Sequence, residues 1–69
     1  MNTELLIAHG NQCREERRPE EALAYYAQAF TQDRHSAGAF NNYGNVLREC
    51  GEPEAGIPFL QRSIQLDPT

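Results

Sequence analysis

The chain has 69 residues and a mass of 7.8 kDa, which leaves room for one domain at most because domains usually need about 100 residues to bury a sizeable core. A net charge of −4 excludes the basic surface that phosphate backbones and anionic lipids require, so we expect neither nucleic acid nor a membrane as a partner. All basic residues are arginines, which excludes lysine-dependent phosphate binding and Schiff-base chemistry.

The first predicted element is a helix over residues 3–16. Apolar or small residues recur from Leu6 at His9, Gly10 and Cys13, which is the i, i+3, i+4, i+7 spacing of one helical face. We expect this whole face, His9 included, to pack against the next helix.

The second predicted helix covers residues 19–33. Pro19 is followed by two glutamates, a pattern typical of a helix start, because proline fits the first turn and carboxylates favour the positive end of the helix dipole. Apolar residues then continue from Ala22 through Tyr26 to Phe30. This spacing favours one long amphipathic helix.

Two further helices are predicted over residues 37–50 and 53–66. Ser36 is placed to cap the first of them, and Gly51 to end it, because glycine readily adopts the left-handed conformation. A proline–glutamate pair again begins the last helix. Pro58 lies inside that helix, where its ring would clash with a preceding carbonyl, so we expect a local 3₁₀ turn or kink there.

The second half of the chain repeats the first with a shift of 34 residues. A period between about 20 and 50 residues indicates a stacked-repeat architecture. Seven aligned pairs are identical, namely Gly10/Gly44, Asn11/Asn45, Arg14/Arg48, Glu15/Glu49, Pro19/Pro53, Glu20/Glu54 and Asp33/Asp67.

The spacing within each copy resembles the tetratricopeptide repeat (TPR) family. The resemblance implies an all-α fold in which residues 1–69 form a single TPR domain. Two stacked helix-turn-helix repeats, residues 3–36 and 37–69, would give four antiparallel helices in a right-handed solenoid fragment. The second copy reads Phe40-x₂-Tyr43-Gly44-x₂-Leu47, Gly56-x₃-Leu60 and Pro68, and the first reads Leu6-x₂-His9-Gly10-x₂-Cys13 and Ala22-x₃-Tyr26, with Arg34 in place of the proline.

A second helical face carries repeated polar residues. Asn11 and Arg14 in the first helix recur as Asn45 and Arg48 in the third, and each arginine is followed by a glutamate. The resemblance implies that this face lines a concave groove, where amides can hold a peptide backbone and arginine can grip a carboxylate. Alternatively, Arg14 or Arg48 pairs with a glutamate of its own or the neighbouring repeat. The predicted peptide-binding residues are Ile7, Asn11, Arg14, Asn41, Asn42, Asn45 and Arg48.

Residues 40–51 are also similar to the repeats of O-linked N-acetylglucosamine transferases, whose grooves carry an asparagine ladder. Asn42 matches a ladder position, which Ala8 occupies in the first copy.

Our leading hypothesis is a non-catalytic interaction module that binds a protein or an extended peptide on its concave face. One alternative is the N-terminal, substrate-selecting repeat segment of a larger glycosyltransferase- or sulfotransferase-like enzyme. Another is self-association into a homo-oligomer through the C-terminal helix, where Ile57, Leu60 and Ile64 would partly face outward.

No arrangement of residues indicates catalysis or a cofactor. His9 and Cys13 share a helical face, but a metal site needs about three or four ligands, so we predict that both pack in the core. Cys50 lies at a helix end, where we expect it to be exposed. The two cysteines lack redox or metal spacing, and residues 5–8 form too short an apolar run for a signal peptide. We therefore expect a cytoplasmic protein that is not an enzyme, without metal or cofactor.

Overall fold

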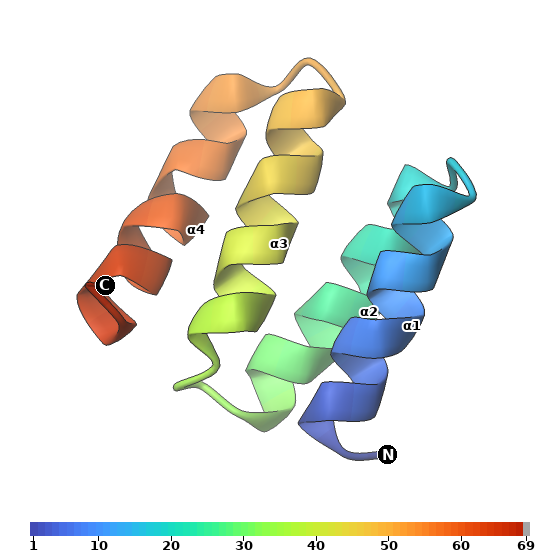
Figure 1. The fold of residues 1–69 in the computed structure, drawn as a ribbon. Helices are drawn as coiled ribbons and strands as arrows, with labels where there is room; N and C mark the ends of the chain where they lie inside the picture. The colour runs from blue at the N-terminus through green and yellow to red at the C-terminus, as the bar shows by residue number, and fades with distance from the viewer. Residues whose placement is uncertain (69) are drawn as a thin grey trace.

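The computed structural model describes residues 1–68, and those residues form four α-helices and no strand. Figure 1 shows α3 between α4 and the pair formed by α1 and α2. The predicted all-α fold is confirmed, and the helices form two helix-turn-helix repeats, α1 with α2 and α3 with α4. Their bounds are Thr3–Glu15 for α1, Pro19–Gln32 for α2, Ala37–Glu49 for α3 and Pro53–Leu66 for α4.

The helix starts agree with the prediction, and local capping explains two of them. The side chain of Asn2 accepts a hydrogen bond from the Leu5 amide at 2.8 Å, and Ser36 accepts one from the Ala39 amide at 3.3 Å. Three predicted ends are one residue too long, because the last predicted residue is in each case the C-cap, which only half belongs to the helix. These C-caps are Glu16, Asp33 and Cys50.

α1 and α3 end in the same backbone geometry. Gly51 has a φ of 84°, as predicted for a helix-ending glycine, and Arg17, its counterpart in the first repeat, has a φ of 63°. In both repeats the next amide donates to the carbonyl five residues back, at 2.8 Å in the first and 2.9 Å in the second. This bond is the mark of a Schellman C-cap, which favours glycine at the left-handed position.

Pro58 does not break α4. The segment is α-helical from Pro53 to Leu66, so of the two predicted irregularities the 3₁₀ turn is wrong, and the kink stays a prediction. Pro58 is exposed, which places its ring on the solvent side of the helix. A carbonyl that loses its helical donor on that side can turn towards water, which lowers the disruption.

The core runs through both repeats. One buried cluster combines Cys13 of α1 with Ala22 and Tyr26 of α2 and Val46 of α3. A second joins Leu6 of α1, Ala29 of α2 and Ala39 of α3, and both alanines are fully buried. Both predictions for the cysteines are confirmed, because Cys13 is buried and Cys50 is exposed.

Aromatic rings extend this packing to α4. Phe30 of α2 stacks on Phe40 of α3 with ring centroids 4.6 Å apart. Tyr43 of α3 then packs on Phe59 of α4 at 4.5 Å. Aromatic contacts of this kind add to the stabilisation from buried area alone, so the ring chain holds the second repeat on the first.

The prediction that His9 packs in the core is wrong. His9 is exposed, and its ring stacks on Tyr25 with centroids 5.4 Å apart. Its counterpart in the second repeat, Tyr43, is half-buried because Phe30 of α2 packs against it. Among residues 1–68, no helix lies against the corresponding side of α1, which explains why equivalent positions differ in burial.

Candidate functional site

Polar side chains of α1 and α3 meet where the two repeats lie side by side. We call this surface the α1–α3 face and define it by Asn11 and Arg14 of α1 and Asn42 and Glu49 of α3. Two contacts join these helices directly, one between the asparagines and one between the arginine and the glutamate. The face therefore depends on the stacking of both repeats.

Arg14 and Glu49 form a two-pronged ion pair across the repeats. The arginine Nε donates to Oε1 of Glu49 at 3.1 Å, and Nη2 donates to Oε2. The hydrogen bonds from Arg14 lower the pKa of the Glu49 carboxyl, and the bond to Glu49 raises the pKa of the guanidinium. For Arg14, the structure thus shows the pairing with a neighbouring glutamate that the sequence left as an alternative.

Asn11 links the core to the same face. Its side-chain oxygen accepts a hydrogen bond from the hydroxyl of Tyr26 at 2.5 Å and a longer one from Nδ2 of Asn42 at 3.4 Å. Tyr26 is fully buried, and burial raises the pKa of its hydroxyl. Because a buried hydroxyl needs a partner, Asn11 has a packing role as well as a place on the surface.

Other predicted site residues on α3 retain free polar groups. Arg48 is exposed and Asn45 half-buried, and neither side chain makes a hydrogen bond or ion pair within residues 1–68. Asn45 and Arg48 follow Asn42 at successive intervals of three residues, so the three lie along one side of α3. These groups are available to a ligand.

Two predicted residues take no part in the contacts that define this face. Asn41 lines an open depression between the start of α3 and the end of α4, together with Ser63 and Ile64. Ile7 is half-buried and packs against both core clusters. Asn11 contacts Asn42 and not Asn45, its counterpart in the second repeat.

An open depression of about 440 Å³ lies on the α1–α3 face, lined by Asn11, Arg14, Glu15 and Glu49. Its lining combines an amide, a neutralised arginine and two carboxylates. Within residues 1–68 no three histidine, cysteine or acidic side chains come together as metal ligands. The chemistry on offer is hydrogen bonding and charge recognition.

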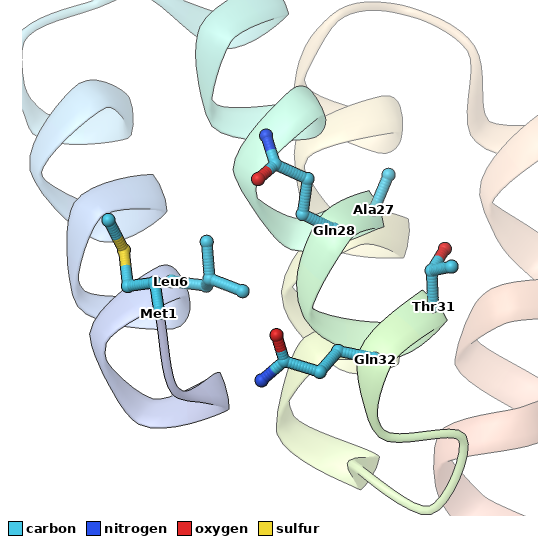
Figure 2. A pocket seen from close by; sticks show the side chains of 6 residues that line it. All are labelled: Met1, Leu6, Ala27, Gln28, Thr31 and Gln32. Atoms are coloured by element: carbon cyan, nitrogen blue, oxygen red, sulfur yellow. The ribbon is translucent and has the colours of Figure 1, made fainter.

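A second depression of about 460 Å³ lies between α1 and α2 (Figure 2). Met1 and Leu6 lie on one side of it, and Gln28 and Gln32 of α2 lie on the other. It is lined by aliphatic, thioether, amide and hydroxyl side chains, and none of the lining side chains is ionisable. We therefore favour the α1–α3 face as the candidate site.

Sequence reasoning missed Tyr26 as a partner of this face. Tyr26 occupies the motif position where the TPR pattern has phenylalanine, so its extra hydroxyl was the available signal that a nearby acceptor was needed. The choice of Asn11 as acceptor had no local signal, because the two residues come from different helices and lie 15 apart in sequence.

Comparison with known proteins supports the interpretation of the repeats. The tetratricopeptide repeat family matches residues 37–69, which contain α3 and α4. Members of this family generally serve as protein-interaction modules, and they bind through surfaces formed by stacked helices. No curated protein matches the chain. Separately, no helix within residues 1–68 has the length and apolar character needed to cross a membrane.

Proposed function

We propose that the chain is a non-catalytic module that binds an extended peptide or a protein segment on the α1–α3 face and on the adjoining side of α3, which carries Asn45 and Arg48. Within this proposal residues 3–36 and 37–69 act as two repeats of one domain. The observation that carries it is the row of polar groups along α3, Asn42, Asn45 and Arg48, of which the last two have unused hydrogen-bonding capacity.

The charges on this proposed binding surface favour a ligand that carries a carboxylate near Arg48. Glu49 already neutralises Arg14, so Arg48 is the cation there without a hydrogen-bonded partner among residues 1–68. A guanidinium can bind a carboxylate through two parallel hydrogen bonds. Asn45, one turn away, can both donate to and accept from a peptide backbone regardless of the ligand's side chains.

The test is selection of peptides from a random library, followed by calorimetry with the selected peptide. We expect Arg48→Ala to weaken binding about tenfold or more, because a hydrogen bond to a charged group contributes about 1.5–3 kcal/mol. Asn45→Ala should weaken binding less. The matched control is Arg62→Ala, which removes an exposed arginine from α4. Equal losses for Arg48→Ala and Arg62→Ala would contradict the assignment of the face.

A second candidate function is self-association through α4. Ile57 is 48% exposed and Ile64 63% exposed, and both lie on this helix. Exposed apolar side chains that form a patch favour association.

The finer alternatives from the sequence stay predictions. They are the likeness to O-linked N-acetylglucosamine transferase repeats and a role as the substrate-selecting segment of a larger enzyme. The cytoplasm as the place of action is proposed because Cys13 is buried and Cys50 exposed, both as free thiols, which suits a reducing compartment.

A further inference from the structure

The exposed face of α4 repeats the part of α2 that contacts α3. The 34-residue period maps Leu23 and Phe30 of α2 onto Ile57 and Ile64 of α4. Phe30 stacks on α3, and Leu23 packs against the core cluster that contains Val46. On α4 the corresponding isoleucines remain 48% and 63% exposed. Among residues 1–68, the α4 end therefore carries the first half of a repeat junction, and no described helix packs on it.

The opposite end of the molecule carries the complementary half. Ala39 of α3 is fully buried at the junction with α2, and the repeat period maps it onto Leu5 of α1. Leu5 is 51% exposed. The two ends thus expose apolar side chains at positions equivalent to those that pack together inside the molecule.

The charges on the α1–α3 face follow the same register. Arg14 of the first repeat pairs with Glu49 of the second. In the repeat register Arg48 corresponds to Arg14, and Glu15 corresponds to Glu49. If a second chain continued the repeats, the equivalent ion pair would therefore join Arg48 of the first chain to Glu15 of the second. Arg48 and Glu15 are both exposed, and neither forms an ion pair within the described part of the chain. A following copy would supply each with a partner of opposite charge.

We propose that a second copy of this chain stacks head to tail on the first, with α4 of one copy against α1 of the next. The contact would reproduce the internal α2–α3 junction, with Ile64 facing Leu5, Ile57 facing Gln12 and an ion pair between Arg48 and Glu15. This inference rests on the second proposed function, self-association, and gives it a geometry. It does not depend on peptide binding.

The geometry is heterologous, so a stack of any length keeps one free α1 end and one free α4 end and can grow. The contact between two copies should be weaker than the internal α2–α3 junction. The reason is that α1 has the polar residues Gln12 and His9 where α3 has Val46 and Tyr43. Gln12 is exposed and hydrogen-bonds to Glu16 at 2.8 Å, so its burial would cost desolvation. We therefore expect weak association in which the length of the stacks grows with concentration, rather than a dimer of fixed size.

Blocking each end separately tests the geometry by sedimentation equilibrium over a roughly hundredfold concentration range. Leu5→Asp blocks the α1 end and Ile64→Asp blocks the α4 end. Each variant alone should be a monomer, whereas an equimolar mixture should form a 1:1 complex, because one intact face of each kind remains. Both positions are exposed, so circular dichroism and melting curves should match those of the unmodified chain.

A charge exchange gives an independent measurement. Arg48→Glu and Glu15→Arg should each weaken self-association. Mixing the two variants should restore it, because every contact between unlike variants then pairs opposite charges at these two positions. Persistent self-association of Leu5→Asp at the level of the unmodified chain would overturn the head-to-tail geometry in favour of a symmetric α4 contact. A monomeric unmodified chain throughout the range would overturn self-association itself, while leaving the peptide-binding proposal to its own test.

Discussion

At the scale of single residues, two equivalent helix ends adopt the left-handed backbone conformation with different residues. One of them is glycine, which favours that conformation, and the other is arginine, which does not. Gly51 adopts a φ of 84° without a side chain to strain, and no atom lies within 4 Å of where its Cβ would stand. Arg17 adopts a φ of 63° with a full side chain. For residues other than glycine, the left-handed region costs about 1 kcal/mol or more.

We expect Arg17→Gly to stabilise the fold by about 0.5–1 kcal/mol, since relief of the strain exceeds the entropy that glycine loses on folding. The melting temperature should rise by about 2–8 °C. Arg17→Ala is the matched control, because it removes the same charge and keeps the Cβ. It should give no comparable gain. A rise of equal size in both variants would assign the effect to charge instead of backbone conformation.

At the scale of helices, the close contact between α3 and α4 depends on two facing glycines. A Cβ built on Gly56 would lie 2.6 Å from the carbonyl oxygen of Gly44, and one on Gly44 would lie 2.7 Å from Cγ of Leu60. In the first repeat, Gly10 faces the ring of Tyr26, and the position of Gly56 is taken by the buried Ala22. The second helix pair therefore has the tighter backbone contact.

We expect Gly56→Ala to destabilise the fold by about 1–3 kcal/mol, because the atom in the way belongs to the backbone and the helices must separate. The control is Gly38→Ala in α3, where the new Cβ would meet only Cδ1 of Ile7, at 3.9 Å. That change should be neutral or stabilising by up to about 1 kcal/mol through helix propensity. Urea unfolding of both variants measures the difference in their free energy of unfolding. Similar unfolding midpoints for Gly56→Ala and Gly38→Ala would contradict the tight backbone contact between α3 and α4.

Helices were predictable here because their signals are local. Proline–glutamate starts, a serine cap and a glycine end are each read from a few neighbouring residues, and the structure shows all of them. Burial was harder to predict, because it depends on what packs from another repeat. His9 and Tyr43 hold the same motif position, yet only Tyr43 has a ring of α2 against it.

At the scale of the whole molecule, the pairing between repeats was the least predictable part of the candidate site. The sequence showed that Asn11 and Arg14 recur as Asn45 and Arg48, but it did not show the offset between stacked helices. In the structure Arg14 reaches 35 residues ahead to Glu49, one residue beyond the repeat period. The offset is set by the packing of α2 between α1 and α3, which no single segment encodes.

The Arg14–Glu49 pair should couple the two repeats in a pH-dependent way. The folded-state pKa of Glu49 is lower than its unfolded value of about 4.3, so the pair contributes stability above that value and loses it as pH falls through the folded pKa. Both side chains are partly exposed, which limits the contribution to about 0.2–1 kcal/mol.

We therefore expect Glu49→Gln to be less stable than the unmodified chain at pH 7, with the difference closing as the pH falls below about 4. Urea unfolding from pH 7 to pH 3 measures this closure. A double-mutant cycle with Arg14→Gln separates the coupling between the two residues from the effect of each alone. A difference between Glu49→Gln and the unmodified chain that stays constant down to pH 3 would mean that Glu49 acts through packing. The repeats would then be held together by the aromatic and aliphatic junction without help from charge.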